Sequence, residues 1–360
     1  MSRPVQEAIT SFLELWDREG EPWGEALGHV EEARRLFASL IGARPGEVAV
    51  TPGATYGFNA LVSMLRLGGN AVAGPANFPT TYYTLHALRR RGVLREVRIV
   101  KPQGEVPSLE DWERAIDDET SLVVADHVSW ITGYMEDLKA LAEVAHRHGA
   151  VLVTDAFHSV GVVPVDVKRL SVDGLVVGSY KWLMGPHGAG FAYASPSILD
   201  GAEPLLSGWM AIRDGVLDRY ARGERLFERP LDIHELAPAG DARVMEWGTW
   251  PILALEGLLA SLKHMIMGLD APGRYESHTR MLVERLMDGL EELGYALITP
   301  RASKAGIVTF RHRDPYQAAN MLAGRGIIVS PRPGRIRVSP HFYNTREEIE
   351  ALLDALGRRW

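Results

Sequence analysis

The sequence predicts an α/β fold: a mainly parallel sheet covered by helices, followed by a smaller α+β part. Three observations predict it. Apolar runs of strand length alternate with helical patterns from about residue 47 to 195, which is typical of a doubly wound parallel sheet. Residues 196–245 are irregular, and after them helices and strands no longer alternate in this way. A chain of 360 residues is also long enough for two domains.

The elements of the first part follow from local patterns. Residues 5–19 and about 30–41 have helical spacing of apolar positions, and each run ends at a glycine. Short apolar runs between turn residues predict strands. We expect strands at residues 47–50, 70–74, 94–100, 120–126, 151–156, 173–180 and 188–195. We expect helices from about residue 55 and within 77–91, 108–116 and 136–149.

The second part begins with two long helices, expected at about 251–267 and 275–293. Further strands are expected at 305–312, 327–330 and 335–339, and further helices at 314–326 and 345–357. The chain is therefore divided into three parts. An N-terminal segment (1–24) is expected to pack on the small domain, with a large domain at 25–245 and a small C-terminal domain at 246–360.

Composition excludes several classes of function. The chain is 46% hydrophobic and 24% charged, and its net charge of -7 offers no basic surface for nucleic acid. No apolar run is long enough to span a bilayer. The N-terminus is amphipathic and does not resemble a signal peptide, so we expect a cytoplasmic protein. Cysteine is absent, which excludes disulfides, thiolate metal sites and a cysteine nucleophile. We expect no metal site.

Two side chains stand where a parallel sheet binds its ligands. Asp155 ends one apolar run, and Lys181 follows another. Ligands of open α/β sheets lie at the carboxyl ends of the strands, so both point into one crevice and suit a ligand with a cationic end and a carbonyl end. A lysine among apolar neighbours is a candidate Schiff-base amine, because desolvation lowers its pKa. The alternatives are a surface lysine and a turn carboxylate.

A phosphate site is predicted beside them. The segment TPGA precedes a helix that begins near Thr55, and the N–H groups of a helix N-terminus bind phosphate. Gly53 permits a tight approach, although simple N-capping explains the same pattern. Ser179 and Tyr180 adjoin the lysine and can donate further hydrogen bonds.

These motifs resemble the cofactor site of a known family. The run TDAFHSVGVVPVDV…DGLVVGSYKWLMGPHGAGF is similar to the pyridoxal-phosphate site of class V aminotransferases. That family includes cysteine desulfurases, selenocysteine lyases, isopenicillin N epimerases and kynureninases. TPGATYGFN resembles its phosphate loop, and GRIRVSPHFYNTREEIE resembles its substrate-carboxylate motif. The resemblance covers residues 5–358 and implies fold type I with pyridoxal 5′-phosphate as cofactor.

The resemblance implies a role for each residue of the motifs. Lys181 would form the Schiff base and move the α-proton, and Asp155 would pair with the pyridine nitrogen. His158 would lie beside the phenolic oxygen or the phosphate. Phe78 would stack on the ring, although it could equally be a core residue. The phosphate would be held by Ala54, Thr55, Ser179 and Tyr180.

Substrate and partner contacts are implied in the same way. Arg337 would bind the substrate α-carboxylate through a bidentate pair, with a surface ion pair as the alternative. Trp130 and Trp209 would line the substrate pocket, unless Trp209 is structural. Gly248 and Thr249 resemble a segment that reaches the phosphate of the neighbouring subunit, which implies a homodimer with shared active sites.

The expected activity is that of a pyridoxal-phosphate enzyme acting on a small-molecule amino acid, first of all an aminotransferase. A C–S lyase without a catalytic cysteine and a kynureninase-like hydrolase stay open, because they share the steps up to the carbanion. Three departures from the family bear on this choice. The chain has no cysteine to carry a persulfide, and Thr81 stands where kynureninases have an aspartate. The chain also starts almost at its first helix, so we expect it to lack a short segment that enters the site in relatives.

Two functions of other classes are less well supported. A dinucleotide-dependent oxidoreductase needs G-x-G-x-x-G after the first strand, and TPGATYG does not match that pattern. A non-catalytic relative would not be expected to keep both Asp155 and Lys181.

Overall fold

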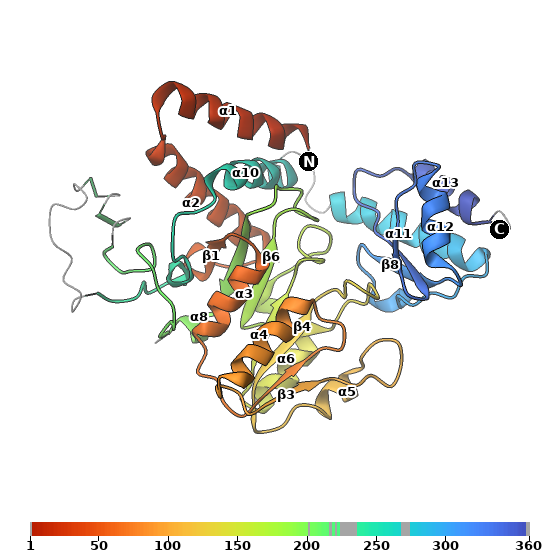
Figure 1. Cartoon of the computed structure of the whole chain (residues 1–360), viewed down its shortest axis with the longest axis horizontal. Coiled ribbons are helices and arrows are strands. Elements are labelled where there is room, and N and C mark those ends of the chain that lie inside the picture. Colours follow the sequence, from red (N-terminus) through yellow and green to blue (C-terminus); the bar gives the residue numbers. More distant parts are fainter. Residues whose placement is uncertain are drawn as a thin grey trace.

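The computed structural model describes residues 2–200, 202–215, 218–219, 222–223, 236–267 and 274–357. A larger body contains a seven-stranded sheet between helices, and a smaller body beside it contains a three-stranded sheet with its own helices (Figure 1). None of the described helices is long and apolar enough to cross a membrane.

The large sheet has the order β1-β7-β6-β5-β4-β2-β3. Strands β6, β5, β4, β2 and β3 are parallel, and β7 runs antiparallel to both β6 and β1. The predicted, mainly parallel sheet is therefore confirmed. Its strands are β1 (Val48–Thr51), β2 (Asn70–Ala73), β3 (Glu96–Ile99), β4 (Thr120–Asp126), β5 (Val151–Asp155), β6 (Gly174–Gly178) and β7 (Gly190–Ala194).

The helices of the larger body begin at recognisable signals. Ser108 accepts a hydrogen bond from the backbone N–H of Asp111 and starts α5, and Asp137 starts α6 in the same way. The α-helices are α2 (Trp23–Leu40), α3 (Ala54–Ser63), α4 (Pro79–Arg90), α5 (Leu109–Glu113), α6 (Leu138–Arg147), α7 (Val167–Leu170) and α8 (Pro196–Leu199). Short 3₁₀ turns are η1 (Pro45–Glu47), η2 (Ala242–Met245) and η3 (Arg301–Ser303).

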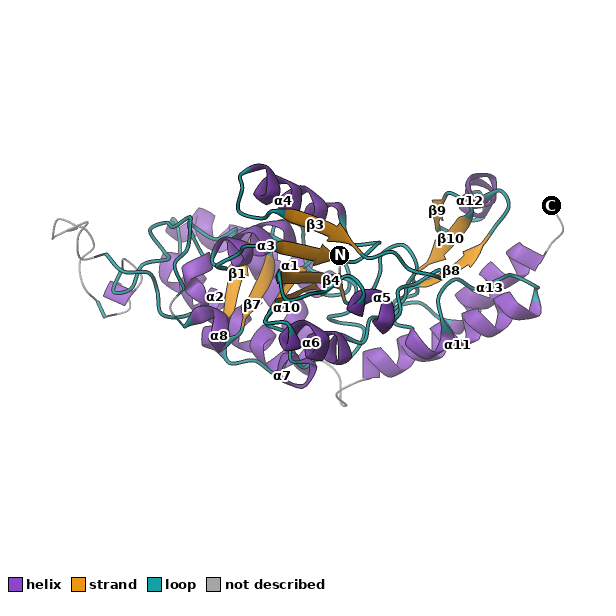
Figure 2. Ribbon diagram, turned by 90° about the horizontal axis from the view of Figure 1, so that it is seen from below, coloured by secondary structure: helices purple, strands orange, loops and turns teal. Residues whose placement is uncertain are grey.

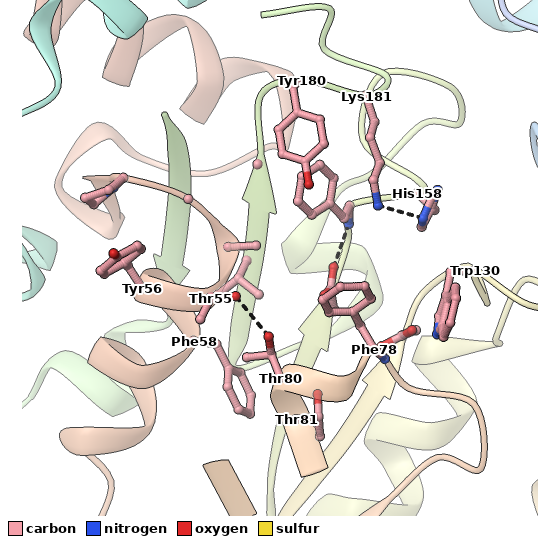
Figure 3. Close-up of a pocket in the computed structure, with 18 of the residues that line it drawn as sticks. Thr55, Tyr56, Phe58, Phe78, Thr80, Thr81, Trp130, His158, Tyr180 and Lys181 are labelled. Atoms are coloured by element: carbon pink, nitrogen blue, oxygen red, sulfur yellow. Dashed lines mark hydrogen bonds between the residues drawn. The ribbon is translucent and has the colours of Figure 1, made fainter. Parts of the chain in front are cut away.

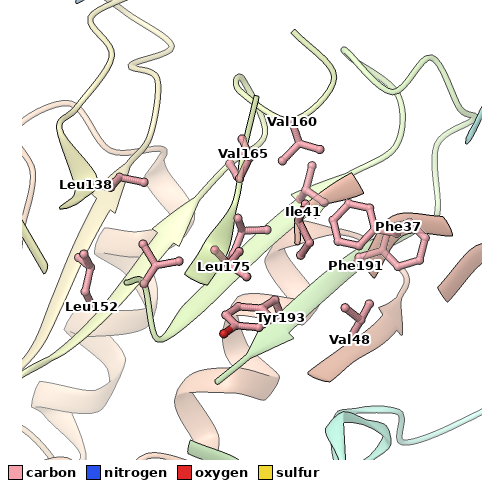
Figure 4. Close-up of a cluster of buried hydrophobic side chains, with 14 of the residues drawn as sticks. Phe37, Ile41, Val48, Leu138, Leu152, Val160, Val165, Leu175, Phe191 and Tyr193 are labelled. Atoms are coloured by element: carbon pink, nitrogen blue, oxygen red, sulfur yellow. The ribbon is translucent and has the colours of Figure 1, made fainter. Parts of the chain in front are cut away.

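Helices bury both faces of the large sheet. Because successive side chains of a strand point to opposite faces, each strand contributes to two cores. In β6, Leu175 and Val177 join the core beneath α2 and α6, whereas Val176 joins the core beneath α3 and α4. Figure 4 shows the first of these cores, in which the rings of Phe37 and Phe191 stack with centroids 4.1 Å apart. A sheet covered in this way leaves its strand ends as the place for a site.

Two helices from distant parts of the chain cover one side of the larger body. Helix α1 (Arg3–Glu19) packs on α10 (Ile252–Met267), and α10 also packs on α2. Leucines of α10 belong to the core of the large sheet. The division at 25–245 and 246–360 stays a prediction. This packing leads us to propose that the boundary lies after α10 and that α1 belongs to the larger body.

The smaller body contains an antiparallel sheet of order β8-β10-β9. It lies beside α11 and α13 (Figure 2). Its elements are α11 (Arg274–Glu292), β8 (Val308–Arg311), α12 (Pro315–Ala323), β9 (Ser330–Arg332), β10 (Arg335–Val338) and α13 (Arg346–Gly357). The strand expected at 327–330 begins only at Ser330. Ile328 is 81% exposed, so this apolar run does not enter the core.

Candidate active site

A cavity opens where β4, β5 and β6 end, facing the N-terminus of α3 (Figure 3). Its volume is about 190 Å³. Strand ends from one edge of a parallel sheet therefore bring together side chains that lie far apart in the sequence. The predicted residues that line it are Ala54, Thr55, Phe78, Trp130, Asp155, His158, Tyr180 and Lys181.

The amine of Lys181 lies inside this cavity. Its Nζ is 3.0 Å from Nε2 of His158 and 4.2 Å from the centre of the Phe157 ring. Trp182 directs its indole Nε1 at Nδ1 of His158, 3.4 Å away. Because indole N–H can only donate, this contact places the imidazole proton on Nε2, which then faces the lysine. The amine is therefore positioned by the Phe157 ring and by the imidazole of His158, which Trp182 orients in turn.

Burial and charge favour uncharged forms of both bases. Burial lowers the pKa of Lys181, and Arg337 adds to this effect while Asp155 opposes it. Burial, followed by the positive charges of Lys181 and Arg337, holds the pKa of His158 well below its usual value. A neutral lysine carries a free electron pair and can act as a nucleophile or a base.

Two carboxylates share the floor of the cavity. Asp126 and Asp155 stand opposite each other in the β4–β5 register, each at the end of its strand. The backbone N–H of Phe157 donates to Asp155, and that of Phe78 donates to Asp126. Burial, and then the neighbouring Asp155, raise the pKa of Asp126 well above its usual value. Burial also raises the pKa of Asp155. The hydrogen bond from the N–H of Phe157 and the charge of Lys181 lower it, but by less.

The opposite side of the cavity is formed by the start of α3. The first N–H groups of a helix have no partner within it, and here they belong to Ala54, Thr55 and Tyr56. The hydroxyl groups of Thr55 and Thr80 are 2.9 Å apart. Gly53 has φ 151°, a conformation that favours glycine. This end of the cavity therefore offers donors to an anion.

Two aromatic side chains, Phe78 and Trp130, form one wall of the cavity. Their ring centroids are 5.8 Å apart, and the angle between the ring planes is 71°. Phe78 is 40% exposed, which does not fit a core residue. Gly178 is needed nearby, because a Cβ at this position would stand 2.4 Å from an atom of the Phe157 ring. The cavity thus has aromatic side chains on its walls, with Asp155 and Lys181 on one side and the N–H groups of the α3 N-terminus on the other.

Arg337, from the smaller body, does not line this cavity itself but contacts Trp130, which does. Its Nη1 donates to the carbonyl oxygen of Trp130 over 2.7 Å, and its Nη2 lies 3.3 Å from the hydroxyl of Ser330. Burial, followed by the charge of Arg332, lowers the pKa of Arg337. No described carboxylate forms an ion pair with this guanidinium, contrary to the surface ion-pair alternative.

A family model described as aminotransferase class-V matches residues 18–352. The chain belongs to the class V aminotransferase family. This is a family of pyridoxal-phosphate-dependent enzymes. An uncharacterised aminotransferase, YcbU, of Bacillus subtilis is 29% identical and covers 100% of this chain and 91% of its own. The kynureninase of Pseudomonas fluorescens is 31% identical, over 94% and 82% of the two chains.

Solved structures share the fold of this class V chain. An apo cysteine desulfurase from Thermococcus onnurineus NA1 is 26% identical and superposes with a TM-score of 0.82, over 99% of this chain and 91% of its own. The cystine C–S lyase C-DES, in complex with cysteine persulfide, is 22% identical with a TM-score of 0.86, over 99% and 94%. The expected fold type I, with a mainly parallel large sheet and a smaller α+β part, is confirmed.

Four of the predicted class V site residues lie elsewhere. Ser179 is fully buried, and its hydroxyl donates to the carbonyl of Pro186 rather than facing the cavity. Gly248 and Thr249 line a separate cavity on the other side of the α3 N-terminus. Trp209 is 40% exposed and stacks on a tryptophan of α2 at 6.4 Å. These roles stay predictions, and the last three cannot be met within this chain's own cavity.

The sequence analysis did not identify several residues of the class V site, among them Asp126, Phe157 and Thr80. Asp126 ends an apolar strand in the same way as Asp155, so the same signal could have found it. Phe157, beneath the lysine amine, gave no signal beyond its place next to His158. Among the described residues, no group of three or more histidine, aspartate or glutamate side chains is placed to hold a metal ion.

Proposed function

We propose that this chain is a pyridoxal-phosphate-dependent aminotransferase that acts on a small amino acid. The observation that carries the proposal is the buried amine of Lys181. It lies in one cavity with the carboxylate of Asp155 and with a helix N-terminus. Few ligands other than pyridoxal phosphate need an amine, an acid and an anion site around one flat ring.

The residues of the cavity fit this cofactor by the chemistry of their donors. The N–H groups of Ala54 and Thr55 and the hydroxyl of Thr55 would hold its phosphate. Phe78 would lie on its ring, and Asp155 would face its ring nitrogen. When bound, the cofactor supplies an aldehyde that condenses with amines and a ring that accepts an electron pair.

The side chains then have distinct tasks. Lys181, whose neutral form is favoured by burial, would take the proton from the α-carbon of the substrate. His158 would hold that amine in place through its Nε2. Arg337 would orient the α-carboxylate of the substrate at the cavity mouth, beside Trp130. The carboxylate of Asp155 would favour a proton, and so a positive charge, on the ring nitrogen of the cofactor.

A second candidate is a C–S lyase or a kynureninase-like hydrolase. Both would use the same proton removal, and the chain has no cysteine for persulfide chemistry on the protein. The kynureninase likeness is supported by Phe78 and weakened by Thr81, which lines the cavity with a short neutral side chain.

A screen decides between these reactions. The enzyme loaded with pyridoxal phosphate is mixed with single amino acids, and the products are assayed for keto acid, sulfide and anthranilate. Keto acid without the other two supports the aminotransferase, whereas sulfide or anthranilate as the main product contradicts it.

We also propose a homodimer with shared active sites. Gly248, Thr249 and Trp209 lie outside this chain's own cavity. A second copy would bring Gly248 and Thr249 to the cofactor phosphate. Sedimentation should give the mass of two chains, and Thr249→Trp should weaken cofactor binding although it is remote from its own cavity. A monomer that binds the cofactor fully would contradict the proposal.

A further inference from the structure

Three arginines share one face of the small sheet. Residues opposite each other in an antiparallel pair point to the same side. Arg337 is opposite Ser330, and Arg335 is opposite Arg332. Ile336 and Val338 point to the other side, into the core of the smaller body. We call Arg332, Arg335 and Arg337 the arginine face.

The arginine face is turned toward the cavity of the larger body. Arg337 donates to the carbonyl of Trp130, and the guanidinium of Arg332 lies 5.5 Å from the centre of the Trp130 indole. Thr309, on the same sheet, donates to the carbonyl of Ile131. Trp130 lines the cavity that contains Lys181. Two guanidinium groups therefore flank one wall of the active site.

These charges have no counter-ion in the part of the chain that the structure describes. Arg311 lies on the same face and pairs with Glu105, but no described carboxylate pairs with Arg332, Arg335 or Arg337. The whole chain has a net charge of -7. A group of unmatched positive charges in an acidic protein is a place where an anionic ligand is attracted.

Buried donors at this wall also have no acceptor. Nε of Arg337 and Nε1 of Trp130 are both enclosed, and neither has a hydrogen-bond partner among the described residues. Buried N–H groups are nearly always paired in native proteins. Among the described residues, the guanidinium of Arg332 donates a hydrogen bond only to the carbonyl of its neighbour Pro331. The wall thus presents more donors than one α-carboxylate can use.

We propose that Arg332, resting on the Trp130 indole, binds a second carboxylate of the substrate, so that the enzyme selects an acidic amino acid. This inference rests on the proposed function, in which Arg337 binds the α-carboxylate. A substrate with two carboxylates would give each guanidinium group a counter-charge. A substrate with a neutral side chain would leave Arg332 without one, next to the positive charge of Arg337. The indole holds the guanidinium by a cation–π contact and so fixes its place at the wall.

The first test uses unreactive acids and needs no turnover. Glutarate and succinate, with butyrate as the monocarboxylate, are titrated into the cofactor-loaded enzyme and followed by calorimetry. Hydrogen bonds between charged groups imply that the dicarboxylates bind roughly ten- to a hundredfold more tightly than butyrate. Arg332→Gln should remove this preference and leave butyrate affinity unchanged, whereas Arg337→Lys should weaken both kinds of ligand.

The second test compares substrates. For the native enzyme, kcat/KM for glutamate or aspartate should exceed that for glutamine or asparagine, and Arg332→Gln should abolish the difference. Arg332→Lys keeps the charge and should retain part of the preference, which separates recognition from misfolding. Arg335→Gln is the matched control. Arg335 shares the face but takes no part in the hydrogen bond of Arg337 or the cation–π contact of Arg332 with Trp130, so this variant should leave the preference intact.

The outcomes separate the two proposals. If neutral amino acids are converted as well as acidic ones, or if Arg332→Gln keeps the dicarboxylate preference, the Arg332 subsite is wrong while the proposed function stands. Equal losses in Arg332→Gln and Arg335→Gln would attribute the preference to overall charge and also overturn the subsite. If no amino acid is converted at all, the proposed function fails, and the titration with glutarate still decides the subsite.

Discussion

Nζ of Lys181 lies 3.0 Å from Nε2 of His158, in a cavity where burial lowers the pKa of both side chains. The charge of Arg337 acts on both in the same direction. The lysine therefore spends more of its time as a neutral amine than a free lysine would at the same pH. The contact joins the nucleophile of the proposed reaction to a neutral imidazole.

Cofactor capture should report this lowered pKa. Only the neutral amine attacks an aldehyde, so the rate at which the apo-protein captures pyridoxal phosphate should rise with pH through a midpoint below 10.5, the ordinary value for lysine. Arg337→Gln should move the midpoint upward, because it removes a positive charge that disfavours the lysine cation. Stopped-flow absorbance measures the rate, with Arg335→Gln as control. An unmoved midpoint in Arg337→Gln would show that this charge does not act on the lysine.

The two carboxylates should respond differently to amide substitution. Burial and the adjacent Asp155 raise the pKa of Asp126 well above its usual value, which favours the uncharged carboxyl that an amide resembles. Asp126→Asn should keep activity within about tenfold, because its amide oxygen still accepts from the N–H of Phe78. Asp155→Asn removes the carboxylate that, in the proposed function, would face the ring nitrogen of the cofactor, and it should cost at least about a hundredfold in kcat. A larger loss of activity in Asp126→Asn than in Asp155→Asn would show that Asp126, and not Asp155, is the carboxylate that the reaction needs.

Glu136 should make stability depend on pH. It accepts hydrogen bonds from Trp112 and Tyr134, and burial raises its pKa from 4.5 to about 7. Its contribution to the free energy of unfolding is fully present below pH 4.5 and is lost as the pH rises through about 7. The reason is that the carboxyl group ionises at a lower pH in the unfolded chain than in the folded protein. The unfolding free energy of the native protein relative to Glu136→Gln should fall by on the order of 3 kcal/mol across this range.

Urea unfolding of both proteins at several pH values measures that difference. His127 acts in the opposite direction, because burial lowers its pKa to about 4 and its contribution is lost as pH falls from 6.5. The comparison with Glu136→Gln cancels the histidine. A difference that does not change between pH 4.5 and 8 would mean that Glu136 does not carry the effect.

A buried ion pair should stabilise the segment that precedes α10. Nη1 of Arg34 lies 2.5 Å from Oε1 of Glu246 and donates to the carbonyl of Val48. Glu246 also accepts from the N–H of Val50 and from the indole of Trp250. Arg34→Ala leaves a buried carboxylate without its partner and should cost roughly 3–5 kcal/mol in urea unfolding. Arg34→Met with Glu246→Met should recover much of this loss, and a single variant as stable as the native protein would contradict the account.

The sequence predicted the parts of the site that depend on local pattern. Asp155 and Lys181 could be placed because each follows a short apolar run, and a parallel sheet brings such positions to one edge. Asp126 carried the same signal. The contact of Arg337 with Trp130 spans 207 positions and depends on how the two bodies pack. No periodicity carries that information, and the same holds for the pair of Arg34 and Glu246.

Other differences have the same origin. The positions of Trp209, Gly248 and Thr249 depend on contacts between distant parts of the chain, because Trp209 stacks on Trp23 and the other two line a cavity with residues of α3. The hydroxyl of Ser179 was expected at the phosphate, but a nearby loop brings the carbonyl of Pro186 to it. Local sequence could identify these residues as polar or aromatic, but it could not identify their partners.

Trapping of the cofactor by borohydride tests the central claim most directly. The protein is incubated with pyridoxal phosphate, reduced and digested, and the modified peptide is identified by mass spectrometry. If Lys181 forms the Schiff base, the native protein should carry one pyridoxyl group per chain, on Lys181, and Lys181→Ala should carry none. Modification mainly at another lysine, or full turnover of amino acids by Lys181→Ala, would contradict it.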